Sequence, residues 1–156
     1  MKNIVFLIVS LFLLSCTSKA QETKKYAVTK TETQWKTQLS ALEYAVLRQA
    51  STERPFSSSL DKNKAEGIYT CKACGVPLYA SQNKFDSGTG WPSFDRAVEK
   101  NIEYDVDYKI GYARSELKCA NCGSHLGHVF DDGPKSTTGM RHCINGVALK
   151  FIPKKQ

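Results

Sequence analysis

The sequence predicts a mainly β domain of antiparallel strands, with short helices at its N-terminal end. Three observations support this prediction. Apolar residues in segment 31–46 recur every three or four positions, segment 103–110 alternates charged and apolar residues, and Gly and aromatic residues punctuate the chain after Pro55. The first pattern is typical of a helix with one buried face, and the second is typical of a strand with one buried face.

The chain has the size and composition of one globular domain. It has 156 residues, of which 41% are hydrophobic and 24% are charged. Without an N-terminal leader about 140 residues remain, which is too short for two ordinary domains. The net charge of +7 comes from scattered basic residues that are not interleaved with aromatic ones. We therefore expect no nucleic-acid partner.

The first residues form a leader. Lys2 precedes an apolar run over residues 4–14, which is too short to span a bilayer but suits a signal peptide. The run ends at Leu14-Ser15-Cys16, which resembles the lipobox of bacterial lipoproteins. We expect residues 1–15 to be a lipoprotein signal peptide and residues 16–31 to be a lipidated Cys16 with a flexible tether. This places the protein in the bacterial cell envelope, outside the cytoplasm and bound to a membrane. The alternative is a soluble secreted protein in which Cys16 is incidental.

Two short helices are expected to open the domain. Four apolar residues are spaced by four, three and four positions on one helical face: Trp35, Leu39, Leu42 and Val46. Capping-box patterns begin at Thr31 and at Ser40, where Gln or Glu follows three residues later. The second pattern predicts a break, so that two helices meet near Ser40.

Two strands are expected after the helices. Segment 103–110 alternates without an error and predicts a half-buried strand. The C-terminal segment predicts a second strand that ends at Pro153. If this strand extends back to Arg141, a period of two brings Arg141, Cys143 and Asn145 to one surface. A bulge at Gly146 would change the register beyond it, but not for these three residues.

Two short segments of the chain repeat one another. Cys71-Lys-Ala-Cys74-Gly and Cys119-Ala-Asn-Cys122-Gly match at both cysteines and at the glycine. In each, glycine supplies the backbone freedom for a tight turn that we call a knuckle. Four thiolates from two knuckles suit tetrahedral zinc, so we expect a structural Zn²⁺ ion on these four cysteines.

Disulfide bonds are the competing interpretation of the knuckles, because exported proteins meet an oxidising compartment. A bridge within one pair closes only a few residues and adds little stability, whereas structural zinc contributes about 10 kcal/mol or more. Bridges across the pairs would stabilise more, and the sequence leaves them open.

A candidate reactive thiol lies at Cys143. Arg141 is two residues before it, and a nearby cation favours the nucleophilic thiolate. The alternative is that Cys143 is only a small buried hydrophobic residue of the core. Two of the three histidines, His125 and His128, lie on one segment with Asp132. A histidine there could donate a proton to a leaving oxygen, and the carboxylate could orient its ring.

A glycine-rich loop supplies a candidate binding wall. Segment 85–94, Phe-Asp-Ser-Gly-Thr-Gly-Trp-Pro-Ser-Phe, is stiffened by Pro92 and presents Trp91. An indole can hold a small apolar group such as a methyl. A core tryptophan is the alternative for this segment alone.

Taken together, these segments resemble methionine sulfoxide reductase B. The resemblance also includes Glu53-Arg54-Pro55-Phe56 and covers nearly all of residues 32–156, which we expect to be the catalytic domain. It implies two antiparallel sheets in a β-tent-like fold, with zinc on the face away from catalysis. It also implies reduction of the R epimer of methionine sulfoxide in oxidised proteins or peptides, as repair under oxidative stress.

The resemblance assigns roles to single residues. Cys143 is expected to attack the sulfoxide sulfur, and His128 to donate a proton to the oxygen with assistance from His125. Further roles are implied for four others: Asp132 and Arg141 shape the hydrogen-bond network, Asn145 positions these groups, and Trp91 receives the substrate methyl. The product is methionine and a sulfenic acid on Cys143, which is the first and reversible step of thiol oxidation.

One position departs from the family pattern. Many members carry a resolving cysteine two residues before the loop tryptophan, where this chain has Thr89. Apart from the knuckle cysteines and Cys16, no second thiol remains. We therefore expect an external thiol to reduce the sulfenic acid, supplied by an extracytoplasmic thioredoxin-like partner.

Two other classes of function remain as alternatives. A zinc-knuckle binding module would have no need of Trp91, His128 and Cys143. A disulfide exchanger that works through its CxxC segments would depend on Cys71 or Cys119 and would survive the loss of Cys143.

Overall fold

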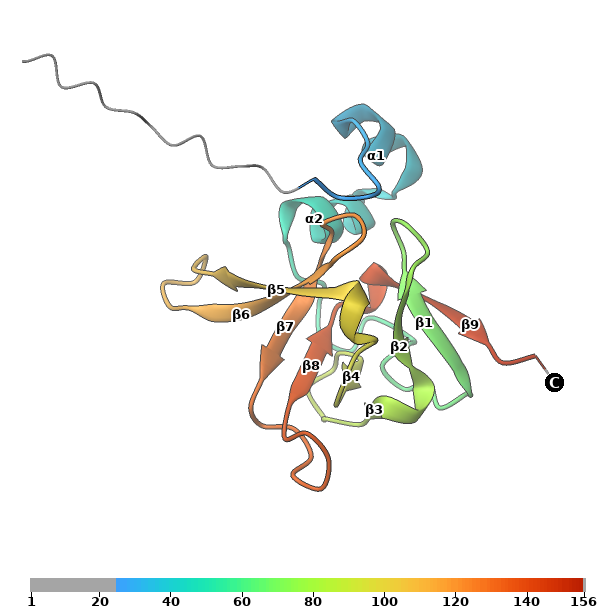
Figure 1. Cartoon of the computed structure of the whole chain (residues 1–156), viewed down its shortest axis with the longest axis vertical. Coiled ribbons are helices and arrows are strands. Elements are labelled where there is room, and N and C mark those ends of the chain that lie inside the picture. Colours follow the sequence, from blue (N-terminus) through green and yellow to red (C-terminus); the bar gives the residue numbers. More distant parts are fainter. Residues whose placement is uncertain (1–24, 156) are drawn as a thin grey trace, which may run out of the picture.

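The computed structural model describes residues 25–155, which form two helices and two antiparallel sheets (Figure 1). The helices are α1 (Glu32–Gln38) and α2 (Ala41–Gln49). The smaller sheet has the order β2 (Pro77–Ala80), β1 (Gly67–Cys71), β9 (Leu149–Pro153). The larger sheet has the order β3 (Lys84–Phe85), β4 (Ser93–Phe94), β8 (Arg141–Ile144), β7 (His125–Phe130), β6 (Arg114–Cys119), β5 (Ile102–Asp107). Short 3-10 turns occur at η1 (Ser81–Asn83), η2 (Glu99–Asn101) and η3 (Gly146–Ala148).

The predicted leader, Cys16 and the first part of the predicted tether lie outside the described residues. Within residues 25–155, neither helix is long and apolar enough to cross a membrane. The described end of the tether segment lies against the second knuckle, because the Val28 amide donates to the Asn121 carbonyl over 2.9 Å.

Both predicted capping boxes are present. The Thr31 and Ser40 side chains accept from the amides of Gln34 and Glu43, whose own side chains accept in return from the cap amides. Two orphan amides are thereby satisfied at each helix start, and the break at Ser40 is confirmed. The prediction is wrong at Leu42, whose side chain is 49% exposed. The turn at Ser40 breaks the helical period, so α2 buries Val46 and Leu47 instead.

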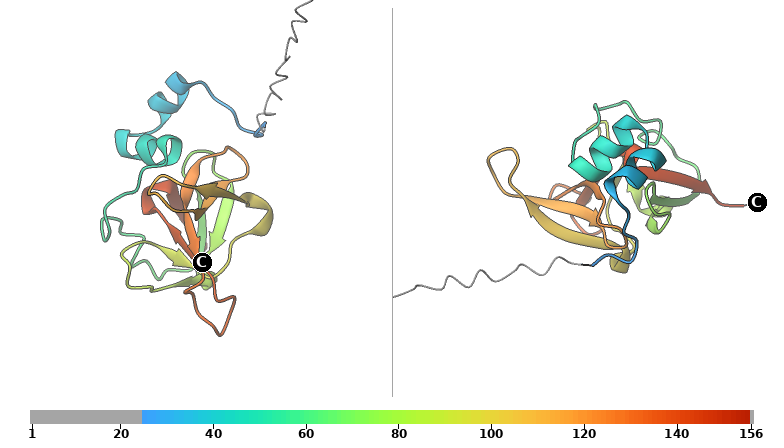
Figure 2. Two further views of the ribbon diagram at one scale, coloured as in Figure 1. Left: turned by 90° about the vertical axis from the view of Figure 1, so that its left-hand side faces the viewer. Right: turned by 90° about the horizontal axis from the view of Figure 1, so that it is seen from above.

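The core lies between the two sheets and is rich in aromatic rings. Tyr69 and Tyr79 come from the smaller sheet and Phe94 from the larger one, and all three are fully buried. Phe94 stacks on Tyr79 with 4.3 Å between ring centroids and meets Tyr69 edge-on at 5.0 Å. Seen from above in Figure 2, the helices lie over the region between the sheets.

The predicted alternating strand exists, but it is shorter and less buried than expected. It is β5, which ends at Asp107, and among the described strands it pairs only with β6. A turn follows in which the Gly111 amide donates to the Tyr108 carbonyl over 3.0 Å. Tyr104 and Val106 are 60% and 52% exposed. The expectation of a half-buried strand is wrong because β5 is the outermost strand and projects beyond the smaller sheet (Figure 1).

The predicted strand that ends at Pro153 is present as β9, but it does not extend back to Arg141, which lies on β8 in the other sheet. β8 ends at Ile144, η3 turns the chain, and β9 begins at Leu149 in the smaller sheet. The cause lies at Gly146, whose amide donates to the buried Glu53 carboxylate. A Cβ at Gly146 would overlap the Ser58 side chain. The chain therefore folds inward after Asn145 rather than continuing as a strand.

Candidate active site and metal centre

The two knuckles have the same backbone geometry. The Gly75 amide donates to the Cys71 carbonyl, and the Gly123 amide donates to the Cys119 carbonyl, both over 2.8 Å. Both glycines have positive φ, at 78° and 70°, in the left-handed region that favours glycine. The internal repeat in the sequence is thus a repeat in structure, with one knuckle at the end of β1 and the other at the end of β6.

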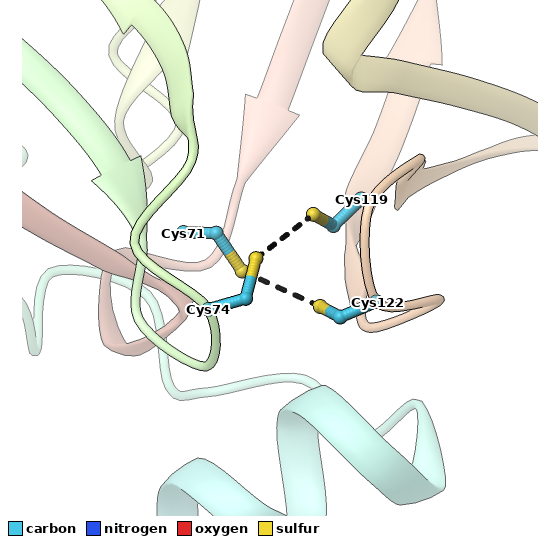
Figure 3. A group of neighbouring side chains, drawn as sticks. All are labelled: Cys71, Cys74, Cys119 and Cys122. Carbon is cyan, nitrogen blue, oxygen red and sulfur yellow. Dashed lines mark hydrogen bonds between the residues drawn. The ribbon is translucent and has the colours of Figure 1, made fainter. Parts of the chain in front are cut away.

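The four knuckle cysteines point at one another (Figure 3). Cys71 Sγ lies 3.8 Å from Cys122 Sγ, and Cys74 Sγ lies 3.6 Å from Cys119 Sγ, with all four sulfurs within 4.8 Å of one another. No disulfide joins any of the five cysteines that the structure describes. Sulfurs at about 2.3 Å from a tetrahedral zinc ion lie about 3.8 Å apart, which these separations fit. The cluster therefore has the ligand chemistry and spacing of a Zn²⁺ site.

The helices brace both knuckles. Gln38 Nε2 donates to the Ala73 carbonyl over 2.7 Å inside the first knuckle. Arg48 donates to the Cys122 carbonyl over 3.1 Å in the second, and its guanidinium lies over the Trp35 ring. The helices therefore connect the knuckle at the end of β1 to the knuckle at the end of β6.

A second group of residues surrounds a cavity at Cys143. The cavity has a volume of about 130 Å³ and is lined by Thr52, Trp91, Arg114, Gly127, His128, Phe130, Cys143 and Asn145. Cys143 on β8 lies directly opposite His128 on β7 and Ser93 on β4. Side chains that are opposite one another in a sheet share a face, so the thiol and the imidazole project to the same side.

The two sites are separate. Arg114, which lines the cavity, and Cys119, which belongs to the cysteine cluster, are the first and last residues of β6. Five residues of strand span about 16 Å, so the cysteine cluster is too distant to contribute to the cavity at Cys143.

His128 is held by a carboxylate that sequence analysis did not identify. His128 Nε2 lies 2.9 Å from Asp107 Oδ2, and the same carboxylate pairs with the Arg114 guanidinium. The hydrogen bond from the Lys109 amide, followed by those from His128 and Arg114, lowers the pKa of Asp107. Burial lowers the pKa of His128, although Asp107 opposes this shift. An ionised Asp107 can only accept, so His128 Nε2 carries a hydrogen and donates it in a hydrogen bond to Asp107 Oδ2. The other ring nitrogen, Nδ1, is not bound to Asp107.

Asp132 has a different partner from the one expected. It forms a two-pronged pair with Arg141, at 2.8 Å from Nε and 2.9 Å from the terminal nitrogen. The expectation that Asp132 could orient a histidine is therefore not met, because Asp107 takes that position. Arg141 also lies over the Phe130 ring, 4.5 Å from its centroid, which fixes the guanidinium beside Cys143.

The Cys143 thiol is influenced by opposing effects. Burial raises its pKa, whereas the Arg141 charge and hydrogen bonds from Thr89 and Arg141 lower it. The net direction is upward, so the resting form at neutral pH is the thiol. The arginine predicted to favour the thiolate is present, but burial outweighs it in the free protein.

His125 lies beside His128 but faces another partner. Their rings are 5.3 Å apart at a steep angle, and His125 Nδ1 lies 2.6 Å from Glu116 Oε1. His125 Nε2 is buried without a hydrogen-bond partner among the described residues. His125 therefore packs against the imidazole of His128 and does not line the cavity.

Glu53 connects two walls of the cavity. Its carbonyl accepts from Trp91 Nε1 over 3.2 Å, and its amide donates to Asn145 Oδ1 over 3.0 Å. Its buried carboxylate accepts from the amides of Gly146 and Val147. One residue therefore fixes the indole, the amide side chain and the turn that follows it.

Sequence analysis missed three residues that shape the cavity, namely Asp107, Arg114 and Glu53. Asp107 and Arg114 are paired across β5 and β6, and the register that joins them to His128 was not evident from either segment. The alternating strand did contain Asp107, and its charged face was the available signal.

Comparison with known proteins agrees with the geometry. The SelR domain family model matches residues 39–153. A peptide methionine sulfoxide reductase MsrB of Chromohalobacter salexigens is 49% identical over 127 residues, which cover 81% of this chain and 96% of that protein. The MsrB of Methanosarcina barkeri is 52% identical over 133 residues, covering 83% and 92% of the two chains. The crystal structure of a Mis18 'Yippee-like' domain matches with a TM-score of 0.48 and 18% identity, over 58% of this chain and 99% of that domain.

The matched range contains both knuckles and every described residue that lines the cavity. The chain therefore belongs to the SelR domain family of peptide methionine sulfoxide reductases of type B.

Proposed function

We propose that the protein reduces the R epimer of protein-bound methionine sulfoxide to methionine, with Cys143 as the nucleophile. One observation carries the proposal most directly. Cys143 lies opposite His128 in the β7 and β8 pair, and both line a cavity that Trp91 closes on another side. The cavity is lined by the Cys143 thiol, the His128 imidazole and the Trp91 indole, which together suit a sulfoxide with one methyl substituent.

In the proposed reaction the Cys143 sulfur attacks the sulfoxide sulfur, and one proton reaches the sulfoxide oxygen. The oxygen passes to Cys143 as a sulfenic acid while the sulfoxide sulfur is reduced to a thioether. Atoms balance as thiol plus sulfoxide giving sulfenic acid plus sulfide. The proton lost by the thiol is the proton that the oxygen gains.

His128 is the group best placed to carry that proton. Asp107 binds Nε2, so Nδ1 is the ring nitrogen left to exchange a proton with the cavity. Asn145 and Trp91 position the substrate and are themselves fixed by Glu53. Arg141, paired with Asp132, supplies positive charge beside the thiolate. His125 supports the His128 ring from the side.

Recycling requires a thiol from another molecule. Thr89 occupies the loop position of the resolving cysteine, and the four knuckle cysteines face one another rather than the cavity. An external thiol attacks the sulfenic acid to give a mixed disulfide and water, and a second thiol then releases Cys143. A thioredoxin-like protein outside the cytoplasm is the proposed donor.

The metal that the knuckles suit is a structural Zn²⁺ ion held by Cys71, Cys74, Cys119 and Cys122. Four thiolates leave no open coordination position, so such a site stabilises the fold without taking part in the chemistry. Bound there, it would join the end of β1 to the end of β6.

The proposed setting is the bacterial cell envelope. The leader at residues 1–15, lipid on Cys16 and a tether over residues 16–31 would hold the catalytic domain, residues 32–156, at a membrane. The substrates would then be oxidised exported proteins. The lipobox-like end of the leader supports this proposal.

The test is an assay with separated epimers of a methionine sulfoxide peptide and dithiothreitol as reductant. Wild type is expected to reduce the R epimer only, and Cys143→Ser is expected to be inactive. Cys74→Ser is a useful comparison, because a CxxC disulfide exchanger would lose its activity there and keep it in Cys143→Ser. Full activity in Cys143→Ser would rule out the proposed nucleophile.

A further inference from the structure

A buried serine joins the second knuckle to helix α2. Ser124 follows the knuckle, directly before β7, and its side chain is fully buried. Its Oγ lies 3.2 Å from Cys122 Sγ and accepts from Arg48 Nη1 over 3.3 Å. The same nitrogen of Arg48 donates to the Cys122 carbonyl over 3.1 Å. The guanidinium on α2 therefore reaches Cys122 twice, once at its backbone and once through Ser124 at its sulfur.

The charge state of Cys122 decides the direction of the bond between Ser124 and the sulfur. As a thiol, Cys122 donates to Ser124 Oγ. As a metal ligand it is a thiolate, which has no hydrogen and can only accept. Ser124 then donates its one hydrogen to the sulfur, because its other described partner, Arg48, has no acceptor atom. With metal bound, the donors would run in order from the Arg48 guanidinium to the Ser124 hydroxyl and on to the Cys122 sulfur.

The metal-loaded cysteine cluster would carry excess negative charge. Four thiolates around one Zn²⁺ ion leave two negative charges, and these ligands are Cys71, Cys74, Cys119 and Cys122. All of them except Cys74 are buried. Buried charge is costly unless hydrogen bonds or an opposite charge compensate it. A cation that reaches the cluster would therefore stabilise the metal-bound form.

Lys72 and Arg48 both lie at the knuckles, but they have different partners. Lys72 is inside the first knuckle and pairs with the Glu43 carboxylate at 3.0 Å. Arg48 bonds to uncharged groups of the second knuckle and of Ser124, and its guanidinium lies 4.9 Å from the centroid of the buried Trp35 ring. Arg48 Nε is buried without a hydrogen-bond partner among the described residues. Little water therefore screens the Arg48 charge, which acts strongly on its surroundings.

We propose that Ser124 and Arg48 are positioning residues of the metal centre. Ser124 donates to the Cys122 thiolate, and Arg48, through Ser124, offsets the negative charge of the four thiolates. The proposal rests on the structural zinc of the proposed function and adds two residues outside the ligand set. It also makes α2 a part of the metal centre, so that retention of zinc depends on a helix that precedes both sheets.

The test is the zinc affinity of the full chain, measured by competition with EDTA. Ser124→Ala removes the hydroxyl and Arg48→Gln removes the charge, and each is expected to lower the affinity by about 10-fold, the lower end of the range for residues that support metal ligands. Because Arg48 acts through Ser124, the double variant is expected to lose less than the product of the two single losses. Ser93→Ala is the matched control and is expected to keep the wild-type affinity, since it removes an equally buried hydroxyl that lies opposite Cys143.

A second measurement separates hydrogen bonding from general loosening of the fold, and it uses protein loaded with Co²⁺ in place of zinc. A hydrogen bond lowers the energy of the sulfur lone pair. The charge-transfer band from sulfur to cobalt is therefore expected at longer wavelength in Ser124→Ala than in wild type. Gln38→Ala is the control and is expected to keep the wild-type band, because Gln38 braces the first knuckle through the Ala73 carbonyl rather than through a sulfur.

Three results would each overturn the proposal: unchanged zinc affinity in either single variant, single losses that multiply in full in the double variant, or the wild-type band in Ser124→Ala. Wild-type protein that binds no zinc would remove the structural metal of the proposed function as well. Neither measurement uses sulfoxide reduction, so failure of this proposal and failure of the proposed activity are distinguishable.

Discussion

Asp107 Oδ2 lies 2.9 Å from His128 Nε2, so the carboxylate that orients the cavity histidine comes from the outermost strand of the larger sheet. Asp107 also pairs with Arg114 across β5 and β6. The hairpin of β5 and β6 is thus part of the candidate active site, and substitutions in it are expected to alter catalysis.

Asp107→Asn is expected to lower kcat for the R epimer by about 10- to 100-fold, a fraction of what a general acid contributes. The variant loses the charge that orients His128 and supports its protonated form. Asp105→Asn is the matched control, since Asp105 is exposed, lies two residues away on β5 and pairs with Lys118. Steady-state kinetics that give equal kcat for wild type and Asp107→Asn would remove Asp107 from the mechanism.

The pH dependence of kcat/KM is expected to be a broad bell. The reaction uses one proton shared by Cys143 and His128, and burial lowers the pKa of His128 while it raises that of Cys143. In acid, His128 gains a proton while Cys143 keeps its own, and this happens only below the ordinary histidine pKa of about 6.5. In alkali, Cys143 loses its proton while His128 is already neutral, and this happens only above the ordinary thiol pKa of about 8.5. Activity is therefore expected to be flat between these values and to fall outside them.

Asp107→Asn should move the acid limb of that profile further toward low pH. Asp107 raises the pKa of His128, so the loss of its charge lowers that pKa. A profile with an optimum narrower than the interval between the two ordinary pKa values would contradict both shifts.

Thr89→Cys is expected to make the recycling of Cys143 intramolecular, through a disulfide within the chain. The Thr89 side chain is near enough to the Cys143 sulfur to lower its pKa, so a thiol at that position is expected to reach the sulfenic acid. Mass spectrometry after one turnover without reductant is expected to find a disulfide between positions 89 and 143. Ser87→Cys is the control, because Ser87 bonds to Thr89 and Ser93 rather than to Cys143. A Thr89→Cys protein that keeps both thiols free would show that the loop is misplaced.

One zinc ion per chain is expected in purified protein, and Cys119→Ser should lose it. Structural zinc contributes about 10 kcal/mol or more, so the melting temperature of Cys119→Ser is expected to be lower than that of wild type by more than about 10 °C. Cys143→Ser should keep both the metal and the melting temperature, because Cys143 lies outside the cluster. Metal analysis and calorimetry check this together, and wild-type protein that melts identically with and without a chelator would contradict it.

Local sequence signals predicted the helices and the knuckles correctly, because each depends on neighbours in the chain. The capping boxes at Thr31 and Ser40 bond within four residues, and each knuckle closes on its own glycine. Local sequence signals failed where contacts with distant segments of the chain determine the structure. The break after Asn145 depends on Glu53, which is about ninety residues earlier in the chain.

The same distinction holds for the candidate site. Cys143, His128, Trp91 and Asn145 were predicted from short motifs, and the structure brings them to one cavity. The partner of His128 could not be predicted from motifs, because a one-residue change of register between β5 and β6 would turn Asp107 to the other face. Leu42 failed for a related reason, since the turn at Ser40 rotates α2 relative to α1.

The central claim is that Cys143 takes the sulfoxide oxygen. The most direct measurement is a single turnover with an R-epimer peptide and no reductant, followed by mass spectrometry with dimedone. The account predicts one methionine formed per chain, with the dimedone adduct on Cys143 and no disulfide to any knuckle cysteine. Methionine formation with an unmodified Cys143, or with a disulfide between Cys143 and a knuckle cysteine, would contradict it.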